Sequence, residues 1–345
     1  MTRVLAPLSF LSRGLLRLGV ASALAAVTSL TLLQRVWTDT PWWLELSRYL
    51  PYPALAAPAV VSLLLSRWLG WRWAVASAAV LGLVGTVAMG LVWAHPAPGP
   101  GTVRFMSYNV KAIKASQRPG GYDALAHEVV LQRPDILALQ DAGGLLAGRV
   151  GVDGPPGSLF GLVHVFAYDQ YVIASRWAMH DCRSGHAADV GFLRCAVDTG
   201  TGGTLQVVTV HFESPRTGLN ATRREGLDGT LEWRRNYRER RAQSSALAAQ
   251  LRMAPRPLVV AGDLNALETS PVVRTLLGLG LRDAFSAGGR GYGYSYGQAL
   301  RIGFSFLRID HILVSPAIGV VDARVGDAGP SEHRPVIADL VLPPS

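Results

Sequence analysis

Several polar and ionisable residues stand where apolar, strand-like runs of the sequence end. Asn109 follows FMSY, Asp141 follows ILALQ, and His211 follows VVTV. A strand that opens into a loop can present such side chains to solvent. Carboxylate and amide oxygens suit Mg²⁺, and histidine adds acid–base and electrostatic capacity, so the set predicts metal-assisted hydrolysis. The complete set is Asn109, Asp141, His211, Asp263, Asn265, Asp310, Glu332 and His333.

Other hydrolytic chemistries lack their motifs in this sequence. CxxC, HExxH and P-loop patterns are absent, which disfavours zinc hydrolysis and P-loop chemistry. SxxK is absent too, and GDLNA and SEHRP do not have the GxSxG pattern, which disfavours a serine nucleophile. Taken alone, GDLNA (262–266) is more typical of a turn than of a catalytic site. The order and spacing of the whole set favour catalysis.

The elements that must position these residues are short strands and two helical stretches. Strand-like runs recur from residue 102 onward, and residues 122–133 and 234–252 have amphipathic helical patterns. This mixture predicts stacked β-sheets with helices on their outer faces.

Six motifs, in this order, resemble the endonuclease/exonuclease/phosphatase (DNase I-like) superfamily. The resemblance covers about residues 102–342 and implies a four-layer α/β sandwich with two central sheets. It also implies a hydrolase that cleaves a phosphoester by in-line attack of water. The motifs are SYNV (107–110), LQD (139–141), VHF (210–212), GDLNA (262–266), RIDHIL (308–313) and SEHRP (331–335).

The resemblance assigns the metal side of the site to three residues. Asp141 takes the position of the main metal carboxylate, and Asn109 and Glu332 help to hold Mg²⁺ or Mn²⁺ or its waters. The family usually has Glu at the position of Asp141 and Asp at the position of Glu332. One methylene is therefore lost at one metal-side position and gained at the other.

The resemblance assigns the remaining roles to the phosphate and the attacking water. Asp263 would orient or activate the water, and Asn265 would bind the phosphate. His333 would stabilise the pentacovalent phosphate, held in orientation by Asp310. His211 would contact the phosphate or assist the leaving group. A neighbouring histidine, His311, is expected to point to the opposite side of its strand and to take no catalytic part.

The first hundred residues are apolar and carry seven arginines but only two acids. They predict about three transmembrane helices, at about 15–34, 50–66 and 73–94, within a membrane region 1–94. A signal peptide is an alternative for the first, and a re-entrant hairpin for the second, which contains three prolines. The run 95–101 predicts a stiff linker, and 102–345 the catalytic domain.

Arginine placement predicts the topology. Arginines flank the first span and occupy the 67–72 link. This placement predicts that the N-terminus and the link lie in the cytoplasm and the catalytic domain outside it, in a multi-pass cell-membrane protein. Outside the cytosol, Cys182 and Cys195 are expected to form a cross-strand disulfide; two unrelated buried thiols are the alternative.

The substrate is predicted from charge and from the membrane region. The net charge of +9 divides into about +5 for residues 1–100 and +4 for the rest, which does not favour nucleic acid. Arg216, close to His211, is expected to bind substrate, whereas later arginines of 213–241 fit either an anion site or an exposed helix. The aromatic stretch 289–311 is expected to form a lip, which would receive a lipid chain or stack on bases.

These features leave three hypotheses. The first is a membrane-anchored, metal-dependent phosphoesterase acting on a phosphoester or pyrophosphate of a lipid-linked substrate. The alternatives are an extracytoplasmic nuclease and a catalytically impaired binding domain. The layout of three spans and the sequence HFESPR (211–216) are similar to membrane-bound members related to teicoplanin-resistance proteins.

Overall fold

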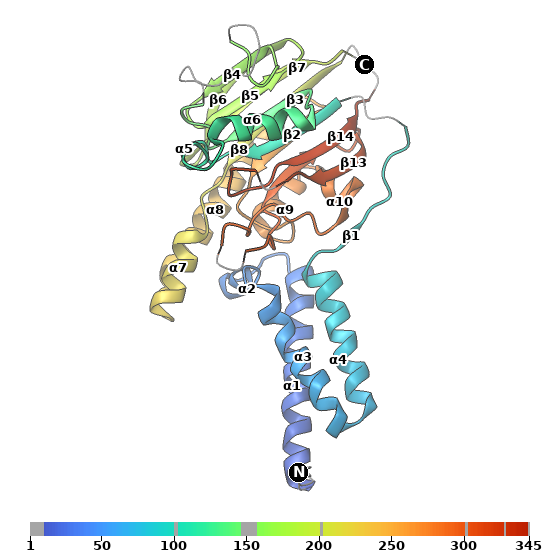
Figure 1. Cartoon of the computed structure of the whole chain (residues 1–345). Helices are drawn as coiled ribbons and strands as arrows, with labels where there is room; N and C mark the ends of the chain where they lie inside the picture. Colours follow the sequence, from blue (N-terminus) through green and yellow to red (C-terminus); the bar gives the residue numbers. More distant parts are fainter. Residues whose placement is uncertain are drawn as a thin grey trace. The chain divides into compact units, whose positions relative to one another are not determined.

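The computed structural model describes residues 10–99, 103–145, 157–200, 203–300, 303–327 and 329–343. Two units divide the chain, Met1–Leu91 and Val92–Ser345 (Figure 1).

The first unit is helical. Among its described residues, three helical segments are long and apolar enough to cross a membrane: Ser12–Val36, Tyr52–Leu69 and Trp71–Ala88. A buried hydrogen bond of 2.6 Å between the Ser62 and Ser77 hydroxyls joins two of them, as polar side chains often do between membrane helices. The elements are α1 (Phe10–Val36), α2 (Trp42–Ser47), α3 (Tyr52–Leu69), α4 (Trp71–Leu83) and the π-helical turn η1 (Val84–Ala88).

The prolines of the second span do not produce a hairpin. Pro51 is the N-cap of α3, and Pro53 lies in its first turn, where a missing N–H removes no helical hydrogen bond. Pro58 lies inside the helix, which nevertheless continues to Leu69. The third span is shorter than predicted at its end, because it stops at Ala88 rather than at about residue 94.

Two six-stranded mixed sheets form the second unit. The first sheet has the order β10-β12-β9-β8-β7-β6, and the second β13-β14-β2-β3-β5-β4. Strands of the first are β6 (Met179–Ala187), β7 (Val190–Asp198), β8 (Thr204–His211), β9 (Leu258–Asp263), β10 (Arg282–Asp283) and β12 (Asp310–Val314). Strands of the second are β2 (Val103–Asn109), β3 (Ile136–Gln140), β4 (His164–Tyr168), β5 (Tyr171–Ser175), β13 (Gly319–Val325) and β14 (Val336–Val341).

The main core lies between the sheets. It joins Phe105 and Ile173 of one sheet to Val207 and Ile312 of the other, all at most 1% exposed. Burial of such side chains from water is the largest stabilising contribution to the fold.

Helices cover the outer faces of both sheets. Helix α6 (Gly121–Gln132) lies across β2 and β3 (Figure 1), and its Leu125 packs with Leu137 of β3. Helix α8 (Thr230–Leu251) contacts β6 of the other sheet and, through a hydrogen bond from Ser244 to the Val272 carbonyl, α9 (Pro271–Leu277). Short helices complete the unit. The predicted α/β sandwich is therefore confirmed. The short helices are α5 (Ala112–Ser116), α7 (Arg216–Glu225) and α10 (Ala284–Gly288).

The segment that enters the second unit is attached to it. Strand β1 (Val92–Trp93) pairs with β11 (Arg290–Gly291). The Ala94 and Ala97 N–H groups then donate to the Gly289 and Val320 carbonyls at 3.1 and 2.7 Å. The predicted stiff linker over 95–101 is thus hydrogen-bonded to the second unit at Ala97.

Cys182 and Cys195 lie on the neighbouring strands β6 and β7. Their sulfur atoms are bonded, and their Cα atoms lie 4.1 Å apart. Cys182 lies between His180 and Arg183, where the register of β6 shifts.

Candidate active site

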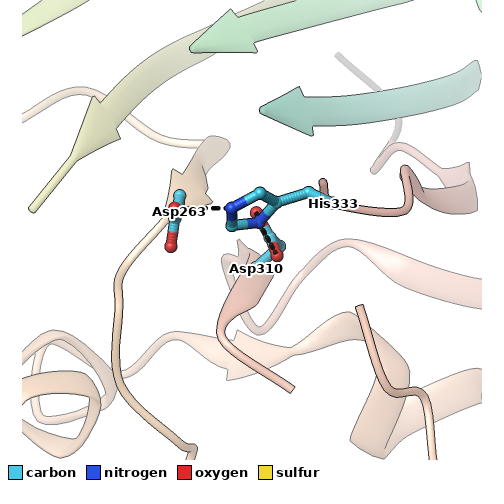
Figure 2. Close-up of side chains that lie close together, drawn as sticks. All are labelled: Asp263, Asp310 and His333. Atoms are coloured by element: carbon cyan, nitrogen blue, oxygen red, sulfur yellow. Dashed lines mark hydrogen bonds and ion pairs between the residues drawn. The ribbon is translucent and has the colours of Figure 1, made fainter. Parts of the chain in front are cut away.

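Asp263, Asp310 and His333 form the centre of the site (Figure 2). Asp263 ends β9 and Asp310 begins β12, and antiparallel pairing makes them direct neighbours. His333 lies in the loop before β14. Its Nδ1 lies 2.9 Å from an Asp310 carboxylate oxygen, and its Nε2 lies 3.6 Å from Asp263 Oδ2. All three residues are at most 2% exposed.

The two carboxylates favour a protonated His333. Burial alone would lower the pKa of this imidazole, but the charges of Asp310 and Asp263 raise it above its usual value. Burial likewise opposes the charged form of Asp263, yet His333 and the neighbouring His211 hold the pKa of Asp263 well below its usual range. The array is thus suited to an imidazolium between two carboxylates.

Asn109 and His211 approach the same Asp263 oxygen from two further strands. Asn109 ends β2 and donates from Nδ2 to Asp263 Oδ2 at 2.8 Å. His211 ends β8, which runs parallel to β9, so it pairs in register with Asp263. Its Nε2 lies 3.4 Å from Asp263 Oδ2, and its Nδ1 lies 2.9 Å from Gln170 Oε1. Residues of both sheets therefore meet at this edge.

The GDLNA loop holds Asn265 close to this centre. Gly262 has φ +149°, and a Cβ there would meet the Val210 carbonyl oxygen at 1.9 Å, so only glycine fits. The Asn265 N–H donates to Asp263 Oδ1 at 2.9 Å, and its side-chain amide donates to the Phe212 carbonyl at 2.8 Å. Asn265 therefore lies beside Asp263, and one of its side-chain contacts stabilises the loop.

Asp141 and Glu332 are each paired with a cation of the chain. Lys111 Nζ lies 2.7 Å from Asp141 Oδ2, and Lys114 Nζ lies 3.1 Å from both Glu332 carboxylate oxygens. Arg118 lies 3.6 Å from Glu332. Burial would raise the pKa of Glu332, but Lys114 and nearby arginines lower it.

Sequence reasoning missed Lys111. Burial would lower its pKa, but the hydrogen bond and charge of Asp141 raise it, so the side chain stays an ammonium. A compositional signal was available: the chain has 31 arginines and only two lysines, Lys111 and Lys114, and both face the carboxylates assigned to metal binding.

The donor types of the site fit a divalent metal ion. Asn109, Asp141 and Glu332 offer the hard oxygen ligands that Mg²⁺ and Mn²⁺ take. An ion at Asp141 would have to compete with the Lys111 ammonium at 2.7 Å. Asp263, Asp310 and His333 also have ligand atoms within 4.8 Å of one another, close enough to hold a metal. Because both nitrogens of His333 face carboxylates, this second group is better suited to sharing protons.

His311 points away from this centre. Its Nδ1 lies 2.6 Å from Asp283 Oδ2, and its Nε2 lies 2.9 Å from the Ala266 carbonyl oxygen. Asp283 also accepts a hydrogen bond of 2.7 Å from the buried Arg308, which in turn contacts Glu268. His311 thus belongs to a buried ionic network that holds the end of the GDLNA loop.

Arg216 and the later arginines occupy different environments. Arg216 begins α7 and is exposed, and its positive charge helps to lower the pKa of Glu332. Arg240 is fully buried and donates to the Asn265 carbonyl at 3.1 Å, so it supports the loop. Arg235 instead forms an exposed pair with Glu239 at 2.9 Å.

The aromatic stretch contacts the site through the Tyr296 ring. The Tyr296 ring lies 4.7 Å from that of His333, centroid to centroid. Tyr292 and Tyr294 stack on each other at 5.2 Å, whereas Phe304 is 48% exposed. Residues 301 and 302 of the expected lip lie outside the described residues.

Comparisons with known proteins agree with this geometry. Residues 106–333 match the Endonuclease/Exonuclease/phosphatase family, and the chain therefore belongs to that family. Membership and the buried Asp/Asp/His site define it as a phosphoesterase. No curated protein sequence matches the chain.

Two solved structures show the same fold. An endonuclease/exonuclease/phosphatase from Beutenbergia cavernae has 20% identity and a TM-score of 0.50, covering 70% of this chain and 72% of its own. An endonuclease/exonuclease/phosphatase from Bacteroides vulgatus has 18% identity and a TM-score of 0.50, covering 70% of this chain and 98% of its own. At these identities the likeness concerns the fold.

Proposed function

We propose that the chain is a membrane-anchored, metal-dependent phosphoesterase that hydrolyses a phosphoester or pyrophosphate of a lipid-linked substrate. The observation that carries the reaction is the Asp263–His333–Asp310 array, in which a buried imidazole lies between two carboxylates. The three apolar helices support a substrate that stays in the membrane.

In this proposal Asp263 acts on the attacking water, and His333 acts on the phosphoryl group. Asp263 accepts a hydrogen bond from the attacking water and orients it toward phosphorus, while Asn109 and His211 hold the carboxylate. The protonated Nε2 of His333 donates to the phosphoryl oxygen that gains negative charge, and Asp310 keeps the ring in place. A divalent ion held by Asp141 and Glu332, with Asn109, would neutralise phosphate charge.

The second unit lies outside the cytosol in the proposed topology. Seven arginines and two acids in residues 1–100 favour a cytoplasmic N-terminus, and three spans then place the second unit outside the cytosol. The Cys182–Cys195 bond supports an oxidising compartment. A reporter enzyme fused after residue 345 should be active only outside the cytosol, and activity in the cytosol would contradict this topology.

A substrate panel tests the proposed function. Purified protein in detergent, with Mg²⁺ or Mn²⁺, is given polyprenyl and glycerolipid phosphates, single-stranded DNA and double-stranded DNA. We expect faster hydrolysis of at least one lipid phosphate than of either DNA, because the catalytic region carries a net charge of only about +4. Faster cleavage of DNA would favour a nuclease, and hydrolysis of neither would favour an impaired binding domain. The likeness to teicoplanin-resistance-related proteins predicts the lipid outcome.

A further inference from the structure

Lys111 is held at the site by an uncommon backbone conformation. It follows Asn109 by two residues and has φ +46°, a left-handed conformation that lysine rarely adopts. Its N–H donates to Asn109 Oδ1 at 3.3 Å, and helix α5 begins at the next residue. Conformations of this kind concentrate at functional sites, where the surrounding structure compensates for their cost.

The carboxylates of the site are balanced by cations of the chain itself. Asp263 and Asp310 share the imidazole of His333. Asp141 faces Lys111, and Glu332 faces Lys114 and Arg118. An incoming phosphate adds negative charge, so it needs a cation that can turn toward it.

Lys111 is suited to be that cation. It borders a hollow of about 380 Å³ together with His211, and its side chain is 21% exposed. Lysine is a compact point charge on a flexible stem, and it binds phosphate in that form. Among the Lys and Arg residues of the chain, all but Lys111 and Lys114 are arginines, so an ammonium group is rare in this sequence.

We propose that Lys111 is a phosphate-binding residue and that its ammonium competes with the divalent ion for Asp141. The inference rests on the proposed phosphoesterase function and adds a substrate contact to it. With nothing bound, Lys111 holds Asp141; when an ion takes Asp141, repulsion between the two cations moves the ammonium toward the phosphate. Removing the ammonium should therefore weaken phosphate binding and strengthen ion binding.

Binding measured without turnover tests this inference. Full-length protein in detergent is freed of metal and titrated calorimetrically with Mn²⁺, and the Mn²⁺-loaded protein is then titrated with inorganic phosphate. We expect Lys111→Met to weaken phosphate binding by at least ~10-fold, the loss of one charge-assisted contact, and to tighten Mn²⁺ binding several-fold. Lys114→Met is the matched control: Lys114 is 49% exposed and does not border the hollow, so phosphate affinity should change by less than ~3-fold.

The outcomes separate this inference from the proposed function. Unchanged phosphate affinity in Lys111→Met, weaker Mn²⁺ binding in that variant, or no phosphate binding by the Mn²⁺-loaded wild type would each overturn it. Lys111→Gln serves the same purpose if the Met variant does not fold. A wild type that hydrolyses lipid phosphates while Lys111→Met keeps its phosphate affinity would refute the role of Lys111 alone. Phosphate binding that depends on Lys111 in a protein without hydrolytic activity would refute the proposed function alone.

Discussion

His333→Ala is expected to lower turnover by at least ~10²-fold, the usual scale for losing one positioned acid or electrostatic group. The ring is the only group seen to contact both Asp263 and Asp310 among the described residues, at 3.6 and 2.9 Å. Alanine would leave two buried carboxylates without their shared cation and the developing phosphoryl charge without its donor. We therefore expect the loss in kcat rather than in substrate affinity.

His311→Ala is the matched control, because His311 is also a buried histidine with a carboxylate partner. Its contacts are with Asp283 and the Ala266 carbonyl, away from the Asp263–His333 pair. The variant should lose stability more than turnover. Steady-state kinetics and thermal unfolding of both variants, on the substrate that the panel identifies, make the comparison. Equal losses of turnover in two well-folded variants would show that the wrong histidine has been assigned.

Asp283→Ala is expected to cause the largest loss of stability. Asp283 is 3% exposed and pairs with Arg308 at 2.7 Å and His311 at 2.6 Å, and it caps α10 through the Ser286 N–H. Removing one member of a buried ion pair costs about 3–5 kcal/mol, which in a unit of this size corresponds to a fall in Tm of roughly 10 °C.

Asp322→Ala provides the control, because its pair with Arg324 at 2.7 Å is partly exposed to solvent and should contribute at most about 1 kcal/mol. Thermal unfolding of the full-length protein in detergent measures both. A similar small effect of the two substitutions would contradict the assigned role of the buried network.

The difference in Tm between wild type and Asp283→Ala is expected to depend on pH. Burial would raise the pKa of Asp283, but Arg308 and His311 hold it well below its usual range. A lowered folded-state pKa means that the stabilisation is present above the ordinary aspartate pKa of about 3.9 and is lost as the pH falls. The Tm difference between wild type and Asp283→Ala should thus be constant near neutral pH and shrink below about pH 4. A difference that grew on acidification would contradict this sign.

The fold could be predicted because its strands carry strong local patterns. Runs such as FMSY and ILALQ are apolar on both faces, as expected for strands covered by a second sheet and by helices. His211 and Asp263 converge because parallel pairing brings the ends of β8 and β9 together, and Asn109 reaches Asp263 from the end of β2 in the other sheet.

Contacts that depend on backbone turns and long side chains could not be predicted in the same way. The pairing of Lys111 with Asp141 requires a left-handed backbone at both residues, for which the sequence gives no periodic signal. The pairing of β1 with β11 joins segments almost two hundred residues apart that are only two residues long. Arg240 lies in a helix whose neighbouring arginines, such as Arg235 and Arg238, are exposed, yet its own side chain is buried.

The most direct test of the central claim is the initial rate of hydrolysis of the lipid phosphates, measured side by side for wild type and Asp263→Asn. Asn preserves the shape of Asp263 but removes the carboxylate that contacts Asn109, His211 and His333. We predict metal-dependent release of phosphate or a phosphomonoester by the wild type, reduced at least ~10²-fold in a variant that remains folded. Equal rates for the two proteins, or no hydrolysis of any phosphoester by the wild type, would contradict the account.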